Sequence, residues 1–302
     1  MAETIYDVMI LGAGPAGLQA AIHAGRRKAS VLVVGKTGKS SAYNAHIDNF
    51  CCLEGRSGGE MLDMAKQKAE AAGAVFCDED VMGINVENDH NAVALESGGV
   101  LKAHALVLAM GVSRNRLGLA NEKECVGKGV SYCVDCDGPL FRENPVAVAG
   151  CGSAAVSGAL TMMFYTDEIH LVCEKLEVGA HLAENLRKSD IVFHEGRRVT
   201  EIKGRDRVTG VVLDDGTELA VNGLFIEQGA KGAVELAGNI GIMLDETMKY
   251  IAVNKKQETN LPGVYAAGDI CGPPWQVAKA VGEGCVAGLE AAGYVRKRKQ
   301  QA

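Results

Sequence analysis

The sequence predicts an α/β protein with two Rossmann-like dinucleotide-binding units, each a three-layer ββα arrangement. A strand, a glycine-rich turn and a helix follow one another near the N-terminus, and the same succession returns in the middle of the chain. The chain has 302 residues, of which 47% are hydrophobic. It is therefore long enough for two domains, each with a core of its own.

The first unit begins with the apolar run Asp7–Leu11, which the turn GAGPAG follows at residues 12–17. A helix-favouring segment and the apolar run of residues 30–34 complete a βαβ unit. Gly12 permits the tight turn, Gly14 lets the backbone approach a pyrophosphate, and Gly17 allows close packing of the helix. Because the helix N-terminus attracts phosphate, this turn is typical of a dinucleotide site.

The second unit repeats this pattern. The strand of residues 145–149 precedes GCGSAA at residues 150–155, a helix-like stretch to about residue 165 and the strand of residues 168–172. Two β-rich segments, residues 208–213 and 218–221, predict a hairpin added to the parallel sheet.

Near the C-terminus, AAGD at residues 266–269 follows a β-rich run and precedes a helix expected from about residue 276 to beyond residue 290. A Gly-Asp pair is often only a turn. At the end of a strand, in a chain with two nucleotide units, we expect Asp269 to contact a cofactor.

Charge and hydropathy exclude several other classes of protein. The formal charge of −7 does not indicate binding to nucleic acid or to an anionic membrane, since both attract clustered Lys and Arg. No run of 18 apolar residues and no signal-peptide pattern occurs, so we expect a cytoplasmic protein. The basic run Arg296–Lys299 is expected to be a solvated, frayed chain end rather than a docking patch.

The strongest chemical signal is CVDC at residues 133–136. No second C-x-x-C pair or nearby histidines accompany it, so we expect no metal site. At a helix start this spacing brings two sulfurs within bonding reach and stabilises a thiolate, so one sulfur attacks while the other resolves. Asp137 follows directly and is expected to protonate the leaving thiolate; a helix cap is the other interpretation, and both roles can hold together.

Four motifs together resemble the low-molecular-weight thioredoxin reductases: GAGPAG at 12–17, VSYCVDCDG at 130–138, GCGSAA at 150–155 and AAGD at 266–269. The resemblance covers nearly the whole chain and keeps the family's order. It implies an FAD-binding domain, residues 1–112 and 246–302, into which a pyridine-nucleotide-type domain, residues 113–245, is inserted. The inserted domain would carry the dithiol.

This resemblance also implies which residues bind FAD. The pyrophosphate would lie on residues 12–17, Asp269 would bind the ribityl or phosphate region, and Asn49 and Gln276 would flank the cofactor. The whole implied set is Gly12, Gly14, Pro15, Ala16, Gly17, Gly35, Lys36, Asn49, Val81, Ala109, Met110, Gly111, Gly268, Asp269, Trp275, Gln276 and Val277. Many flavoproteins place an acid for the adenine ribose where this chain has Gly35 and Lys36. The group that holds the ribose is thus left open.

In the family, electrons pass from reduced FAD to the disulfide, here Cys133–Cys136, and then to a thioredoxin-like partner. The resemblance therefore implies a disulfide reductase that acts as a homodimer. The smaller domain would rotate to carry its dithiol between flavin and partner, about hinges near residues 111–112 and 245–246.

The expected electron donor differs from that of most relatives. NADPH-using members carry arginines for the 2′-phosphate where this chain has Glu174 and Gly179, so NADPH is not the expected donor. The departures resemble reductases that take electrons from ferredoxin or a reduced deazaflavin. Glu174 could instead accept a hydrogen bond from a ribose 2′-hydroxyl, which keeps NADH as an alternative.

Three further questions stay open at this point. Trp275, the chain's single tryptophan, either covers the flavin ring where a nicotinamide would stack or packs in the core. A flavin-dependent dithiol oxidase, which passes electrons from a small dithiol to oxygen, shares the same motifs. A non-catalytic flavin-binding redox sensor is the alternative from another class.

Overall fold

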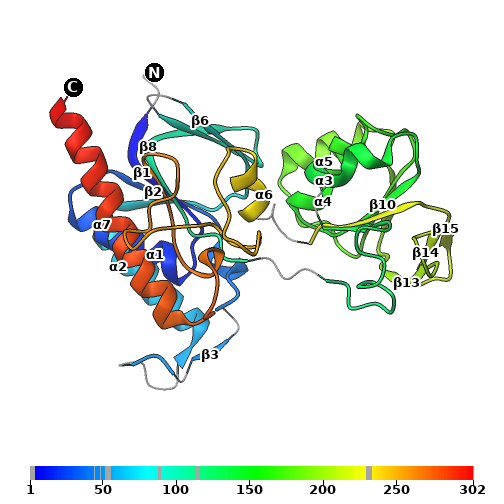
Figure 1. The fold of residues 1–302 in the computed structure, drawn as a ribbon, viewed down its shortest axis with the longest axis horizontal. Coiled ribbons are helices and arrows are strands. Elements are labelled where there is room, and N and C mark those ends of the chain that lie inside the picture. The colour runs from blue at the N-terminus through cyan, green and yellow to red at the C-terminus, as the bar shows by residue number, and fades with distance from the viewer. Residues whose placement is uncertain are drawn as a thin grey trace. The chain divides into compact units, whose positions relative to one another are not determined.

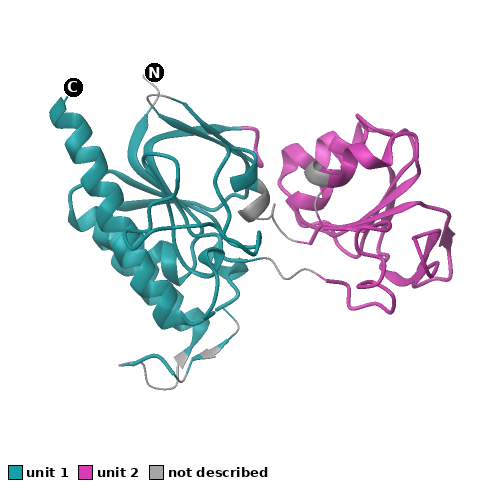
Figure 2. Ribbon diagram, viewed as in Figure 1, with its two compact units in different colours: residues 1–95, 99–112, 236–302 teal, residues 96–98, 113–235 magenta. Residues whose placement is uncertain are grey.

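The computed structural model describes residues 4–43, 45–47, 49–51, 56–87, 90–112, 116–132, 134–228 and 233–301, with the backbone alone at 46, 56, 135, 136 and 233–235. The chain divides into two compact units (Figure 2). Unit 1 comprises residues 1–95, 99–112 and 236–302, and unit 2 comprises residues 96–98 and 113–235. The return to unit 1 thus falls at residues 235 and 236, whereas the sequence analysis placed it at 245 and 246.

Unit 1 is built on a seven-stranded sheet in the order β5-β2-β1-β8-β7-β6, with β17 also paired to β8 (Figure 1). Its strands are β1 (Ile5–Leu11), β2 (Val31–Val34), β5 (Ala74–Cys77), β6 (Val81–Val86), β7 (Asn91–Leu95), β8 (Val100–Leu108) and β17 (Val264–Ala266). Strands β5, β2, β1, β8 and β17 run parallel, while β6 and β7 are antiparallel. Strand β8 therefore joins the N-terminal part of the sheet to the strand supplied by the C-terminal part of the chain.

The helices of unit 1 pack on this sheet through small residues. They are α1 (Pro15–Arg26), α2 (Gly58–Ala71) and α7 (Val277–Gln301), with short 3-10 turns η1 (Thr37–Lys39) and η3 (Asp269–Cys271) and the ribbon β3 (His46–Ile47) and β4 (Arg56–Ser57). Added Cβ atoms at Gly284 and Gly288 would lie 2.1 and 2.3 Å from carbonyl oxygens of α1. Glycine at these positions lets α7 lie against α1, and alanines from both helices join the core.

Local sequence explains where α2 begins. The Ser57 hydroxyl accepts from the Glu60 backbone N–H at 3.2 Å, and the Glu60 carboxylate accepts from the Ser57 N–H at 3.0 Å. This reciprocal capping box satisfies two backbone donors at the helix start.

Unit 2 contains a five-stranded parallel sheet in the order β12-β11-β10-β16-β9 and a three-stranded antiparallel sheet β13-β14-β15. Its strands are β9 (Val130–Ser131), β10 (Val146–Ala149), β11 (Ile169–Cys173), β12 (Val192–Glu195), β13 (Val199–Lys203), β14 (Gly210–Leu213), β15 (Glu218–Leu219) and β16 (Gly223–Ile226). The predicted hairpin is confirmed as β14 and β15, and an apolar core forms between the two sheets.

Helices complete the third layer of unit 2. They are α3 (Val134–Asp137), α4 (Ser153–Met162) and α5 (Ala180–Arg187), with the 3-10 turn η2 (Gly138–Phe141); α6 (Ala233–Gly238) contains the return to unit 1. The predicted α/β fold, with one unit inserted into the other, is confirmed.

The basic run at the C-terminal end of α7 is largely exposed, as expected, but it is helical rather than frayed. The helix continues to Gln301, and Lys299 Nζ lies 2.6 Å from the Asp7 carboxylate, which also accepts from the Ser30 N–H at 2.9 Å. Burial raises the pKa of Asp7, but the hydrogen bonds from Lys299 and Ser30 outweigh it and lower that pKa below the ordinary value.

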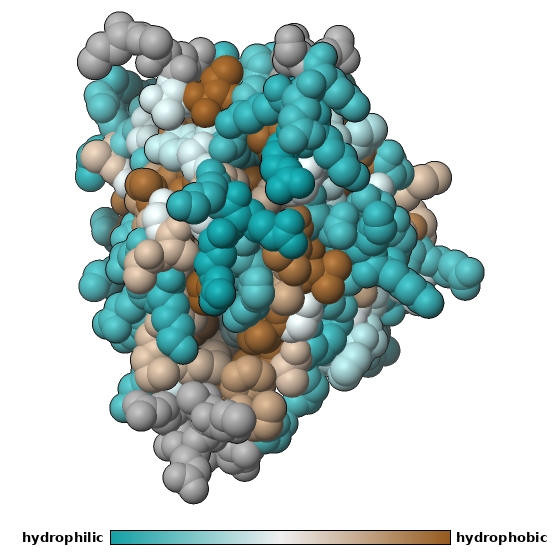
Figure 3. All heavy atoms as spheres, turned by 90° about the vertical axis from the view of Figure 1, so that its left-hand side faces the viewer, coloured by the Kyte–Doolittle hydropathy of each residue, from teal (hydrophilic) through white to brown (hydrophobic). Residues whose placement is uncertain are grey.

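The face of unit 1 turned to the viewer in Figure 3 is largely hydrophilic, with apolar residues in small groups among polar ones. Among the described helices, none combines the length and the apolar character needed to cross a membrane.

Candidate active site

The glycine turn of unit 1 lies where β1 ends and α1 begins. Gly12 has φ +113°, and an added Cβ there would lie 2.3 Å from the Ala109 carbonyl oxygen. A Cβ at Gly17 would lie 1.9 Å from the Gly12 carbonyl oxygen. Both glycines are therefore required by contacts of the protein backbone with itself, and the predicted roles of tight turn and close helix packing hold.

Gly14 differs, because protein atoms alone do not explain it. Its φ of −86° suits any residue, and an added Cβ would meet only the Ser40 side chain, with Ser40 Oγ at 3.3 Å. Gly14 is the N-cap of α1, no side chain caps this helix, and Pro15 occupies its first turn. Backbone N–H groups of the first turn are thus left for an anionic ligand, which fits the pyrophosphate of a dinucleotide.

The ends of β2 and β8 lie beside this turn. Gly35 has φ +136°, and a Cβ there would lie 3.3 Å from the Ala13 backbone nitrogen. Ala109, the residue after β8, donates its N–H to the Leu11 carbonyl at 2.7 Å and so lies next to the end of β1. Met110 and Gly111 continue from this point along the chain.

Lysines occupy the place where many flavoproteins have an acid for the adenine ribose. Lys36 Nζ lies 3.8 Å and Lys39 Nζ lies 3.0 Å from the carboxylate of Asp80, which is 5% exposed. Asp80 directly precedes the buried Val81 at the start of β6. The structure therefore supplies lysines and one paired carboxylate at the end of β2.

A partly buried ion pair on α7, which was not predicted from the sequence, holds the Gly-Asp turn. Glu283 accepts from the Gly268 N–H at 2.8 Å, and Lys279 Nζ donates to the carbonyl oxygens of Gly268 and Gly272, both at 2.7 Å. Lys279 and Glu283 also pair with each other at 3.0 Å. Their i,i+4 spacing directly after AAGD was the available signal.

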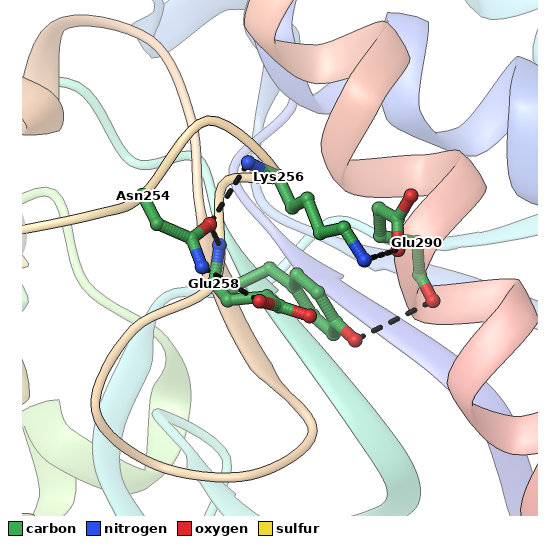
Figure 4. Close-up of polar contacts among 5 residues, drawn as sticks. Asn254, Lys256, Glu258 and Glu290 are labelled. Atoms are coloured by element: carbon green, nitrogen blue, oxygen red, sulfur yellow. Dashed lines mark hydrogen bonds and ion pairs between the residues drawn. The ribbon is translucent and has the colours of Figure 1, made fainter.

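The loop before β17 is fixed by a second polar cluster, shown in Figure 4. Asn254 Oδ1 accepts from the backbone N–H groups of Lys256 and Glu258, at 2.8 and 3.1 Å, and its amide donates to the Glu258 carboxylate at 2.7 Å. Lys256 Nζ lies 3.9 Å from the Glu290 carboxylate of α7. Burial raises the pKa of Tyr265, whose hydroxyl donates to the Glu290 carbonyl at 3.4 Å. These contacts hold the approach to Gly268 and Asp269 against α7.

Two predicted cofactor residues far apart in the sequence meet in space. The Asn49 amide donates to Gln276 Oε1 at 2.9 Å, immediately before α7 begins at Val277. Trp275, the preceding residue, is 44% exposed, so core packing was the wrong alternative for it. The predicted cover over a flavin ring stays a prediction.

The dithiol segment belongs to unit 2. Cys133 lies outside the described residues, and the structure describes only the backbone of Cys136 in helix α3. Asp137 ends this helix, and its carboxylate makes no capping hydrogen bond to the following turn. It accepts instead from the Ser131 hydroxyl at 2.7 Å. The helix-cap alternative for Asp137 is therefore wrong, and Ser131 is a partner that sequence reasoning missed.

Carboxyl groups surround the base of this segment. Glu227 accepts from the Val134 N–H at 2.9 Å. Glu122, 2% exposed, accepts from the Tyr132 hydroxyl at 2.6 Å. Burial and this neighbouring carboxylate raise the pKa of Tyr132 to about 12, so its phenol stays protonated at neutral pH.

The second glycine turn is likewise in close contact with protein backbone, and α4, like α1, has no side-chain cap at its N-terminus. A Cβ at Gly150 would lie 1.9 Å from the Glu227 carbonyl oxygen, and the Cys151 carbonyl accepts from the Glu177 N–H at 2.8 Å. Glu174 follows β11 and lies 3.9 Å from Arg198 Nη1, both side chains being exposed. The hydrogen bond from Glu177 therefore ties the segment after β11 to the glycine turn.

The chain is similar to known proteins over nearly its whole length. The model of the family "Pyridine nucleotide-disulphide oxidoreductase" matches residues 6–284. This chain belongs to that family. The thioredoxin reductase of Listeria monocytogenes is 33% identical over 99% of this chain and 96% of its own length, and that of Mycolicibacterium smegmatis is 32% identical over 96% of each. As a family member, the chain is an FAD-dependent disulfide oxidoreductase.

Solved structures include two informative neighbours of this oxidoreductase. The atypical thioredoxin reductase TRi from Desulfovibrio vulgaris Hildenborough superposes with a TM-score of 0.80, at 33% identity over 96% of this chain and 98% of that one. A ferredoxin-flavin thioredoxin reductase from Clostridium acetobutylicum superposes with a TM-score of 0.68, at 29% identity over 97% and 98%. The likeness thus extends across both units.

Gly14 and Gly17 should respond differently to alanine. Since Gly14 meets no backbone, Gly14→Ala should leave the apoprotein stable but weaken FAD binding about tenfold, because the methyl group faces the pyrophosphate. Gly17→Ala should lower the melting temperature of the apoprotein by roughly 5 °C, because its Cβ clashes with backbone. Flavin titration and thermal unfolding measure the two effects. Gly38→Ala, where nothing lies within 4 Å, is the control; unchanged FAD affinity in Gly14→Ala would contradict the assignment.

Proposed function

We propose that this protein is a thioredoxin reductase that uses FAD and the Cys133–Cys136 dithiol to reduce the disulfide of a thioredoxin-like protein. The observation that carries the proposal is the pairing of Asp137 with Ser131 directly after the C-x-x-C helix. It gives the dithiol a carboxyl group that is held in a fixed position by a side chain outside the helix. The full-length likeness to thioredoxin reductases supports the same reaction.

In unit 1 we propose that FAD is held by the residues implied by the sequence. The uncapped N-terminus of α1 at Gly14 would receive the pyrophosphate, the clamped turn at Gly268 would present Asp269, and the joined Asn49 and Gln276 would flank the ring system. Lys36, beside Asp80, would lie near the adenine ribose. When bound, FAD supplies a two-electron carrier that a donor reduces and a disulfide oxidises.

In unit 2 the reaction steps belong to the two cysteines and Asp137. The Cys133–Cys136 disulfide takes up two electrons and two protons and becomes a dithiol. One thiolate then attacks the partner disulfide, and the second cysteine resolves the mixed disulfide, which releases the partner as a dithiol. Asp137, held by Ser131, would donate the proton that the departing thiolate needs. The protein is proposed to act as a homodimer, as the resemblance implies.

We propose that the physiological donor is a reduced ferredoxin. At the end of β11 the first side chain available to a nucleotide ribose is Glu174, and the nearby Arg198 is paired with it. The hydrogen bond between Glu177 and Cys151 ties the same segment to the glycine turn, where a nucleotide pyrophosphate would bind. The similarity to a protein described as a ferredoxin-flavin thioredoxin reductase points the same way.

An exposed apolar group beside the dithiol segment is the proposed docking surface for the partner. Leu140 is 77% exposed, Phe164 is 82% exposed and Met163 is 41% exposed. The segments that carry them lie side by side, because the Glu143 N–H donates to the Tyr165 carbonyl at 3.0 Å. Aromatic and aliphatic side chains exposed to this degree are typical of protein contact sites.

The donor proposal is tested anaerobically with the FAD-loaded protein by following the flavin absorbance band. Reduced ferredoxin should bleach the band, whereas micromolar NADPH should leave it unchanged, because its 2′-phosphate would meet the Glu174 carboxylate. Glu174 does not disfavour the ribose of NADH, so bleaching by NADH would support the NADH alternative. Bleaching by either nucleotide would overturn the donor proposal. Rapid oxygen consumption with a small dithiol, with no thioredoxin reduced, would instead support the dithiol oxidase.

Removal of the exposed aromatic ring tests the docking surface. Phe164→Ser should raise KM for thioredoxin about tenfold, the size expected for truncation of an interface anchor. Turnover of a small aromatic disulfide should not change, because it needs no docking surface. Met248→Ser, at an exposed residue of unit 1 (70%), is the matched control. A KM for thioredoxin equal to wild type would show that the partner docks elsewhere.

A further inference from the structure

A buried carboxyl group lies at the foot of the dithiol helix. Glu227 is the residue directly after β16, and it is 6% exposed. Its Oε1 accepts from the backbone N–H of Val134, 93 residues earlier in the chain, at 2.9 Å. Val134 is the first residue of α3 and follows Cys133 in the sequence. A long-range contact thus holds the backbone next to the first cysteine.

The surroundings of Glu227 enclose its side chain on several sides. A Cβ added at Gly158 of α4 would lie 3.0 Å from Val134 Cγ2 and 3.6 Å from Glu227 Cγ. A Cβ at Gly150 would strike the Glu227 carbonyl oxygen at 1.9 Å. Glycine on the turn and on α4 therefore makes the room in which Glu227 and Val134 meet.

Burial of the Glu227 carboxyl group costs free energy that apolar packing alone does not offset. Burying a carboxyl group is unfavourable unless hydrogen bonds compensate, and an apolar residue of similar size would fill the space without that cost. The hydrogen bond from the Val134 N–H provides part of this compensation. The position of that bond, one residue from the dithiol, indicates what the carboxyl group is for.

We infer that Glu227 is a positioning residue for the dithiol, an inference that rests on the proposed disulfide reductase function. Its hydrogen bond fixes the start of α3, while Ser131 holds Asp137 at the end of the same helix. The four-residue helix is thus anchored at both ends by side chains from other elements. An ionised carboxylate at this point would also disfavour a thiolate in the adjoining dithiol.

Two variants separate the hydrogen bond from the charge. Glu227→Gln keeps an oxygen that accepts from Val134 but removes the charge; Glu227→Ala removes both. The first readout is the alkylation rate of the reduced Cys133–Cys136 peptide between pH 5 and pH 9, quantified by mass spectrometry. Loss of the charge should lower the midpoint pH of the alkylation-rate profile by about one unit in both variants. The alkylation rate near pH 6 should then rise roughly tenfold.

The second readout is thioredoxin turnover. Glu227→Gln should stay within about twofold of wild type, because the start of α3 is still held, whereas Glu227→Ala should fall about tenfold. Ile202→Val, at a buried residue of β13, is the control for a small loss of stability and should change neither readout. The inference is overturned if both variants keep the wild-type alkylation profile, or if Glu227→Gln loses as much turnover as Glu227→Ala.

Failure of the proposed function would be recognised separately. If the wild-type protein reduced no thioredoxin while the alkylation profiles still shifted, the positioning role would stand and the assigned partner would be wrong. If the wild-type protein reduced thioredoxin but neither Glu227 variant shifted the alkylation profile, the enzyme assignment would stand and the positioning role of Glu227 would be wrong.

Discussion

The backbone contact between Gly17 and Gly12 is the constraint on which unit 1 depends. Only an absent side chain allows the first turn of α1 to lie against the end of β1, because a Cβ at Gly17 would be 1.9 Å from the Gly12 carbonyl oxygen. Gly12 in turn lies against Ala109, at the end of β8. These approaches bring three chain segments to one sheet edge, where the fold class binds its cofactors.

Unit 2 has a similar close contact between a glycine and the backbone, but there it lies beside the dithiol helix. Gly150 packs against the backbone of Glu227 as Gly12 packs against that of Ala109. Neither α1 in unit 1 nor α4 in unit 2 has a side-chain cap at its N-terminus. In unit 2, the turn accepts a hydrogen bond from Glu177, and Glu227 reaches the start of α3. The same supersecondary unit thus supports the start of the dithiol helix in unit 2, whereas in unit 1 it forms the proposed pyrophosphate site.

Local sequence patterns predicted the glycine turns, the helices that follow them and the dithiol motif. The spacing of Gly12, Gly14 and Gly17 after an apolar run fixed the turn and helix, because these requirements involve residues close in sequence. Asn49 and Gln276 were expected on the same cofactor from family resemblance, and the structure joins them through a hydrogen bond. The dithiol and its neighbour Asp137 were likewise visible as one short motif.

What the sequence could not reveal are contacts whose partners lie far apart or compete. Glu227 meets Val134 across 93 residues, so no local spacing marks it. Asp137 could satisfy a helix or another side chain, and only the tertiary position of Ser131 decides between them. Lys299 was predicted to lie in a frayed chain end. Its side chain is exposed, as predicted, but it pairs with a partly buried aspartate of the first strand. The sequence left the location of Trp275 undecided, because tryptophan side chains occur both in cores and at surfaces.

The most direct test of the account is a single anaerobic turnover. The FAD-loaded protein is reduced by light and mixed with oxidised thioredoxin, and both the flavin absorbance and the thioredoxin thiols are followed. Wild-type protein should regain its flavin absorbance as one thioredoxin disulfide is reduced per flavin, and Cys136→Ser should regain none on that timescale. Equal recovery in Cys136→Ser, or wild-type recovery without new thioredoxin thiols, would contradict a path through this dithiol.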